Sequence, residues 1–264
     1  MSKRLRFGDG CGILILTKTE GARRMAYENG EWVLHGLAAD DPYRLKTPWE
    51  VLDYINEVGF LPLFAGEIPG LSVEERTLAT DWWSENEAVD PWEWRRVLAA
   101  SGKVAYGKFF GGKAGFISLA WFPTFCNWRR DGYDFDARYE DELATFREKK
   151  IMDCFQNGER LFSHELKRIA GFGKGGEKNF PGVVAELQKK TYLVLCDFRQ
   201  RLNKKQEPYG WALAVYATPE TVFGADAIAA AYAEKPTAAK ERIFAWLRQE
   251  YPIATEKQIE NLFG

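Results

Sequence analysis

Residues 171–180 read GFGKGGEKNF, and the elements on either side of these glycines decide the fold. The first six residues fit the G-x-G-x-x-G pattern of dinucleotide-binding loops, which requires a strand before the glycines and an acidic residue about twenty positions later. The preceding segment SHELKRIAG (163–171) has helical spacing instead, because Leu166 and Ile169 share one side and Lys167 lies on the other. We therefore predict a glycine-rich turn between two helices, where glycine supplies positive φ.

The chain after the turn continues in the order typical of a winged helix. A third helix is predicted from Phe180 to Tyr192, with Asn179 as its candidate cap and Pro181 near its start. Two runs of strand-forming residues follow, separated by the polar, basic segment from Gln200 to Tyr209. In such folds the third helix typically lies in the DNA major groove and the hairpin loop is the wing. The winged helix is predicted over 139–220, beginning with one long helix over 139–155.

A related unit is predicted over residues 47–136. Thr47 is a good N-cap, and Pro48 fits the first position of the helix that follows it. Further along, two runs of strand formers, 104–110 and 113–119, flank the pair Gly111–Gly112. A two-residue glycine connection favours a hairpin, because primed turns need positive φ. The segment FLPLFAGEIPGLS (60–72) is predicted to be loop, and a second helix is predicted to start at Asp90 with Pro91.

The predicted fold class is therefore α+β and mainly helical, with tandem winged-helix units. Residues 11–18 and 31–37 are apolar runs that we expect to pair as strands ahead of the first unit. The expected organisation is an N-terminal β-hairpin extension (1–46), a first winged-helix-like unit (47–136), a second winged-helix unit (137–220) and C-terminal helices (221–264).

Composition excludes several classes of protein. Hydrophobic residues make up 46% of the 264 residues, which indicates a globular chain, and most of the 10 Trp are expected in the core. The four Cys lie far apart and there are two His, so neither zinc spacing nor a disulfide framework is present, and no metal or cofactor is expected. The N-terminal apolar run is too short for a signal peptide or membrane span. We expect a cytoplasmic protein that acts away from membranes.

Positive charge is concentrated in the second unit. The chain has a net charge of −2, yet residues 159–211 contain eleven Lys and Arg against six Asp and Glu. Lysines on helices and loops are usually only solvated, but this concentration favours contact with the phosphates of double-stranded DNA. We expect these side chains to be exposed. The candidate nucleic-acid-binding residues are Lys174, Lys178, Asn179, Lys189, Lys190, Arg199, Arg201, Lys204 and Lys205.

Other candidate positions lie in the first unit. Tyr106 and Lys108 share one face of the predicted hairpin by two-residue alternation, and with Arg129 and Arg130 they are candidates to line a cleft between the units. The alternative for the two arginines is pairing with the acidic residues of 131–142. A Trp- and Glu-rich stretch, 82–94, is expected to pack its tryptophans inward rather than to form a catalytic carboxylate pair. No catalytic residue can be assigned from these patterns.

Several stretches together resemble a known bacterial family, the AlkZ-related proteins. That family is named for its similarity to the tandem winged-helix DNA glycosylases of the AlkZ type. The resemblance covers about Thr47 to Glu220, and it implies a tandem winged-helix architecture for this chain. The stretches are GFLPLF (59–64), DPWEWRRVL (90–98), VAYGKFFGGKAGFIS (104–118) and FGKGGEKNFPGVVAELQKKTYLVL (172–195).

The resemblance does not extend to the residues of catalysis. AlkZ-type glycosylases use a Gln-x-Gln pair, or a close variant, beside the damaged nucleotide, and the corresponding segment here is expected to be the apolar Pro62-Leu63-Phe64. The family's His-x-Pro hairpin element is also absent, and the chain has room for two winged helices rather than three. We expect a DNA-binding, repair-associated protein without this chemistry. The alternatives are a diverged glycosylase and a winged-helix module that binds a protein partner; the sequence leaves the oligomeric state open.

Overall fold

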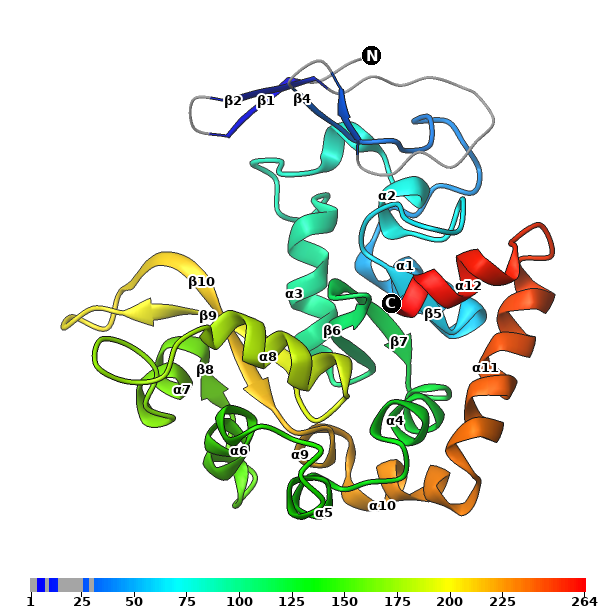
Figure 1. Ribbon diagram of the computed structural model, residues 1–264. Coiled ribbons are helices and arrows are strands. Elements are labelled where there is room, and N and C mark those ends of the chain that lie inside the picture. The colour runs from blue at the N-terminus through cyan, green and yellow to red at the C-terminus, as the bar shows by residue number, and fades with distance from the viewer. Residues whose placement is uncertain (1–3, 8–9, 14–25, 29–30) are drawn as a thin grey trace.

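The computed structural model describes residues 4–7, 10–13, 26–28 and 31–264 (Figure 1). It is an α+β structure in which helices surround small antiparallel sheets. At the N-terminus two separate hairpins form, β1 (Arg4–Phe7) with β2 (Gly10–Ile13) and β3 (Ala26–Glu28) with β4 (Glu31–Val33). We expected residues 11–18 and 31–37 to pair with each other, but their described strands, β2 and β4, pair with β1 and β3 instead. Residues 14–18 lie outside the described part of the chain.

The first unit contains a three-stranded sheet with helices against it. The ladder between β6 and β7 joins Val104 to Ser118 and turns at Gly111–Gly112, which confirms the predicted hairpin. Both glycines have positive φ, 56° and 84°. The sheet order is β5-β7-β6. The elements are α1 (Pro48–Val58), β5 (Phe60–Pro62), α2 (Val73–Arg76), the 3₁₀ turn η1 (Ala79–Asp81), α3 (Pro91–Ser101), β6 (Val104–Phe110) and β7 (Lys113–Ser118).

The second unit repeats this order of elements. In both units a helix, a short strand, two helices and two longer strands follow one another, and the last strand lies in the middle of the sheet. The second sheet has the order β8-β10-β9. The elements are α6 (Phe146–Met152), the 3₁₀ turn η2 (Asp153–Phe155), β8 (Leu161–Phe162), α7 (Ser163–Ile169), α8 (Phe180–Lys189), β9 (Val194–Leu202) and β10 (Pro208–Ala217).

The glycine-rich stretch is a turn between two helices, as predicted. Helix α7 leads into Gly171, so no strand enters the glycines and the dinucleotide loop is excluded. Gly171 and Gly173 have φ values of 73° and 146°, which residues with a Cβ rarely adopt. The Glu177 N–H donates to the Gly171 carbonyl at 3.0 Å, and the Gly173 N–H donates back to the Glu177 carbonyl at 3.1 Å. These two bonds close the turn upon itself.

Four sequence predictions about element bounds are wrong. Helix α8, predicted to reach Tyr192, ends at Lys189, because Thr191 has a φ of 61°. The long helix over 139–155 is divided into α5 (Phe135–Glu140) and α6, because Glu142 has a φ of 59° and Thr145 caps a new helix. The expected wing loop is shorter, since β9 and β10 extend into it and leave the turn 203–207. The segment 60–72, expected as loop, begins with β5, which pairs with β7.

The two larger clusters of buried hydrophobic residues in the described chain support the two units. The larger core joins the first unit to the C-terminal helices, with Phe263 of α12 packed among the rings of Phe60, Phe125 and Trp128. A smaller core fills the second unit between α6, α7 and α8. Trp82 is fully buried, as expected for the tryptophan-rich stretch. The remaining elements are α4 (Phe122–Arg130), α9 (Pro219–Phe223), α10 (Ala225–Ala229), η3 (Ala230–Ala233), α11 (Pro236–Glu250) and α12 (Glu256–Phe263).

The units contact each other through aromatic and guanidinium groups. The Arg95 guanidinium of α3 lies 3.7 Å from the Trp92 ring centroid and 4.4 Å from that of Phe198 on β9. Tyr106 of β6 also faces Phe198, with the ring centroids 6.1 Å apart. Because Arg95 is sandwiched between rings of both units, it joins them by cation–π contacts on each side.

An ion pair ties α6 to the end of α8 in the second unit. Lys190 Nζ lies 2.5 Å from Glu148 Oε1, and the Glu148 side chain is only 4% exposed. Burial opposes ionisation of Glu148, but the Lys190 ammonium and the Thr145 N–H donate to the carboxylate and lower its pKa below the ordinary value. This stabilisation is present at neutral pH and is lost as the solution becomes acidic enough to protonate Glu148.

We expect Lys190→Glu to lower the free energy of unfolding by about 3 kcal/mol, because it leaves a buried carboxylate facing a second negative charge. The matched control is Lys189→Glu, whose partner Glu186 is half exposed and which we expect to cost less than about 1 kcal/mol. Urea unfolding of the three proteins measures both values. Equal stability of the two variants would show that the buried pair is not important.

A second buried carboxylate connects the N-terminal segment to the first unit. Glu74 is inaccessible to solvent, and its two oxygens accept the His35 N–H at 2.8 Å and the Ala65 N–H at 2.9 Å. Burial raises the pKa of Glu74 to about 7, although both N–H donors act to lower it. Between the ordinary carboxyl pKa and pH 7 the folded protein thus holds a proton that the unfolded chain has released.

The free energy of unfolding should therefore fall as pH rises from about 4.5 to about 7, by at most roughly 3 kcal/mol from this group. Glu74→Gln cannot ionise, so we expect the slope in this window to become shallower. Urea unfolding at several pH values, with wild type beside the variant, measures the difference. Parallel curves for the two proteins would contradict the assignment.

Candidate nucleic-acid interface

Four of the candidate lysines are exposed and make no ion pair with any described residue. Lys174 and Lys178 lie in the glycine turn between α7 and α8, and Lys204 and Lys205 lie in the turn between β9 and β10. Since no carboxylate neutralises them within the described chain, these ammonium groups are available to an anionic ligand. They stand on two projecting turns of the same unit.

The glycine turn also bounds a shallow pocket of about 460 Å³. Its charged lining is entirely basic among the residues that border it, and no acidic side chain is among them. Glycine backbone forms much of the rest of its wall, so a ligand can approach the main chain closely. This combination suits a phosphate group. The lining residues are His164, Lys167, Arg168, Gly171, Phe172, Gly173, Lys174, Gly175 and Gly176.

The second basic turn is held in place by its own side chains. The Asn203 carboxamide oxygen accepts the Lys205 N–H at 2.8 Å and the Glu207 N–H at 3.1 Å. Along β9, Arg201 lies over the Tyr209 ring at 5.1 Å, whereas Arg199 pairs with Asp197 at 2.5 Å. The hairpin therefore presents Arg201 and the two tip lysines, while the charge of Arg199 is balanced locally.

Helix α8 is poorly suited to enter a groove of DNA. Lys189 and Lys190, expected to be exposed, are half-buried and pair with Glu186 and Glu148. The end of the helix also packs on the first unit, where the Gln188 carboxamide oxygen accepts the Lys108 N–H at 3.1 Å. The expectation that these two lysines are exposed is therefore wrong, because both side chains already bind carboxylates.

Asn179 is exposed at the start of α8, with a φ of 64° and no side-chain cap bond. It borders a second pocket, of about 720 Å³, in which the carboxyl groups of Glu148, Glu177 and Glu186 also take part. Because Arg147 and Lys190 also line this pocket, its lining has mixed charge and is less favourable to phosphate than that of the glycine turn. Asn179 therefore borders this second pocket and is not among the residues that line the pocket of the glycine turn.

The four residues predicted to line a cleft between the units differ in their burial and in their partners. Tyr106 is 4% exposed and packs between the units, whereas Lys108 is exposed, because the β6–β7 ladder is irregular between Gly107 and Phe110 and interrupts the alternation. Arg129 Nε donates to the Lys189 carbonyl at 3.1 Å and does not pair with the acidic residues that follow it.

Arg130 is likewise buried, at 3% exposure, and its partners come from distant segments. Its guanidinium donates to Glu220 Oε1 at 2.6 Å, to the Thr191 carbonyl at 2.7 Å and to the Tyr232 hydroxyl at 3.2 Å. The expected pairing with residues 131–142 is thus replaced by a network that joins α4 to the second unit and to η3. Arg130 acts in packing rather than at an open cleft.

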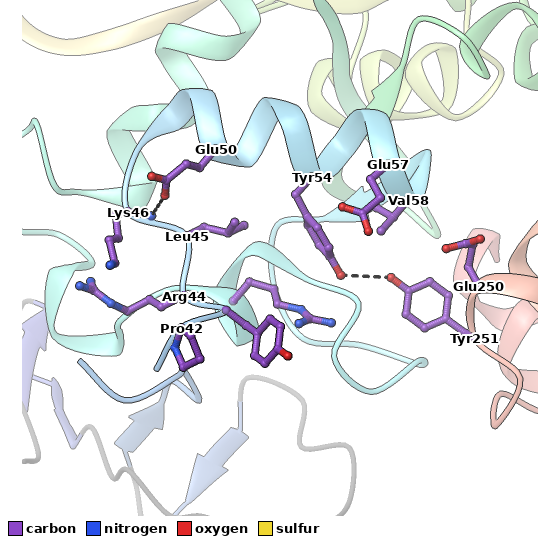
Figure 2. Close-up of a pocket in the computed structure, with 12 residues that line it drawn as sticks. Pro42, Arg44, Leu45, Lys46, Glu50, Tyr54, Glu57, Val58, Glu250 and Tyr251 are labelled. Carbon is purple, nitrogen blue, oxygen red and sulfur yellow. Dashed lines mark hydrogen bonds between the residues drawn. The ribbon is translucent and has the colours of Figure 1, made fainter. Parts of the chain in front are cut away.

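Figure 2 shows a further pocket, of about 550 Å³, that sequence patterns did not indicate. It lies between the connector before α1, α1 itself and the end of α11, and the Tyr54 and Tyr251 hydroxyls meet in it at 3.4 Å. Glu57 and Glu250 line one end of this pocket and Arg44 and Lys46 line the other, so the lining has mixed charge. Helix α11 and the β9–β10 hairpin lie at opposite sides of Figure 1.

The segment expected to correspond to the glycosylase residues is built into the core. Pro62 lies in β5 and Leu63 is 1% exposed, while the Phe64 ring packs on Trp82 with centroids 5.1 Å apart. The adjacent carboxylate of Glu74 is occupied by backbone N–H groups. No group of acidic, His or Cys side chains suited to a metal ion occurs among the described residues. None of the described helices has the length and apolar character needed to cross a membrane.

Comparison with known proteins gives one structural neighbour and one family. The DNA glycosylase AlkZ of Streptomyces sahachiroi is similar, with a TM-score of 0.43 and 13% sequence identity. The match covers 80% of this chain and 53% of that structure, so the chain spans about half the length of the glycosylase. A search of curated proteins found no match. The AlkZ-related family matches residues 45–264, which is most of the chain and includes both repeated units, and the protein therefore belongs to the AlkZ-related family.

Proposed function

We propose that this protein binds double-stranded DNA through its second unit and that both repeated units are winged helices. The observation that supports binding most directly is the pair of projecting basic turns, whose four lysines have no acidic partner among the described residues. Outside residues 159–211 the chain has seven more acidic than basic residues, so a polyanion would be attracted to this unit and repelled elsewhere.

The winged-helix assignment rests on the order and pairing of the elements. Three helices precede a hairpin, and a short strand between the first two helices pairs with the last strand of that hairpin. In the second unit the turn 203–207 takes the place of a wing, and it is basic and exposed. Family membership supports a role in DNA repair, because the family is described as related to AlkZ and the similar solved structure is a DNA glycosylase.

The proposed contacts are with the DNA backbone rather than with bases. Lysine on a flexible stem neutralises phosphate charge without reading sequence. The glycine turn and the hairpin turn provide the contacts, in place of the side chains of α8, whose lysines are paired. Binding should therefore tolerate changes of sequence and weaken steeply with salt.

We expect the quadruple change to Glu at Lys174, Lys178, Lys204 and Lys205 to weaken duplex binding at least tenfold. The slope of log affinity against log salt should become shallower by about 3 to 4, since each lost phosphate contact removes close to one unit. Titration of a fluorescent duplex at several salt concentrations measures both effects. The matched control changes Lys46, Lys113, Lys235 and Lys257 to Glu; these residues are also exposed and lie outside the second unit.

The control has the same net charge as the test variant, so it separates a local interface from a general effect of charge. We expect it to keep most of the wild-type affinity and the wild-type salt slope. Equal losses in the two variants would mean that the basic turns are not the interface. Absence of duplex binding by the wild type would refute the proposed function itself.

We propose that the protein does not excise alkylated bases. Activating a water beside a departing base requires a polar group within hydrogen-bond reach, and Pro62, Leu63 and Phe64 provide none. Incubation with alkylated duplex DNA, followed by cleavage at abasic sites, should give no more product than DNA alone, while an active glycosylase serves as the positive control. Turnover by this protein would identify it as a diverged glycosylase.

A further inference from the structure

One aromatic side chain of the second unit is fully presented to solvent. Trp211 on β10 is 91% exposed, the highest exposure among the large hydrophobic residues described, and it makes no ring contact with another described residue. Other aromatic side chains of the unit range from buried, such as Tyr192 at 2% exposure, to partly exposed, such as Phe146 at 59%. A single exposed hydrophobic residue is common on protein surfaces, so the case for a binding role rests on the backbone and the neighbouring residues of Trp211.

The backbone fixes the direction of this side chain. Tyr209 pairs with Arg201 and Leu213 pairs with Arg199, so three residues of β10 stand opposite the single residue Gln200. Gly210 within this bulge has a φ of 71°, and the Gln200 carboxamide donates to its carbonyl at 3.0 Å. Bulges redirect side chains out of the regular alternation of a strand. Trp211 is therefore held outward by the hairpin rather than left loose at a chain end.

The surroundings of Trp211 show what kind of ligand it suits. The same hairpin presents Arg201, Lys204 and Lys205, and Tyr209 beside Arg201 is 44% exposed. Cations next to exposed aromatic rings are the combination that binds nucleic acid through phosphates and base faces together. An acidic protein partner would satisfy the charges and would also bury the indole, since tryptophan is common in protein interfaces. The glycine turn of the same unit favours phosphate instead, because the charged side chains that line its pocket are all basic and much of the remaining wall is glycine backbone.

We propose that Trp211 stacks on an unpaired base, and hence that the preferred ligand is duplex DNA interrupted by unpaired nucleotides. This inference rests on the proposed DNA binding and deepens it. In a continuous duplex each base face is covered by its neighbours, and exposing one requires unstacking. An unpaired base offers its face without that cost, while the adjacent duplex supplies phosphates to the basic turns.

The test compares two DNAs of the same length, a continuous duplex and a duplex with a short single-stranded gap. We expect wild type to bind the gapped DNA about tenfold more tightly, within the range measured for stacking on one base. Trp211→Ala should lose this preference and keep the affinity for continuous duplex. Trp211→Phe, which retains a ring, should keep part of the preference.

The control variant is Trp49→Ala, because Trp49 is 50% exposed but lies on α1 of the first unit. It should retain the wild-type preference. Equal affinity of wild type for both DNAs, or an unchanged preference in Trp211→Ala, would overturn the inference while leaving duplex binding intact. Failure to bind either DNA would instead refute the proposed function. A change in oligomeric state of Trp211→Ala, without a change in DNA preference, would assign the indole to a contact between copies and also overturn it.

Discussion

The arrangement of the two units depends on the buried guanidinium of Arg130. A charge in a protein interior must be paired and hydrogen-bonded, and Arg130 satisfies this by reaching Glu220, the Thr191 carbonyl and the Tyr232 hydroxyl. Thr191 follows α8, Glu220 lies in the first turn of α9, and Tyr232 lies in η3. One side chain of α4 therefore holds the segments before and after the second hairpin. The adjacent Arg129 adds a bond to the Lys189 carbonyl.

This arrangement decides which surfaces remain available. Since the carbonyls at the end of α8 accept bonds from α4, and Gln188 binds the backbone of β6, the end of the helix belongs to the interface between units. The lysines there are balanced by Glu148 and Glu186. The glycine turn and the β9–β10 hairpin project beyond the interface, and they contain four lysines that make no ion pair with the described residues: Lys174, Lys178, Lys204 and Lys205. The inter-unit contact thus moves the candidate interface from a helix to two turns.

Sequence reasoning succeeded where the determining chemistry is local. Thr47 caps α1, and Gly111–Gly112 closes a hairpin, because each feature depends on residues only a few positions away. It failed where partners are distant. Strand β5 exists through pairing with β7, and Lys190 is half-buried because Glu148, 42 residues earlier, lies against it. The Figure 2 pocket joins segments from both ends of the described chain, so no single stretch could indicate it.

Residues 62–64 show how the sheet holds a segment in place independently of its side chains. Pro62 lies in the β5–β7 ladder, Leu63 donates its N–H to the Ala114 carbonyl at 2.9 Å, and Phe64 joins a cluster of tryptophan rings. The backbone there is held by the sheet, whatever its side chains are. Side chains at such positions can therefore change from polar to apolar without altering the fold, and here they add to the core. Contacts with DNA, in contrast, need only exposed groups on turns, so the proposed binding does not depend on the chemistry of this segment.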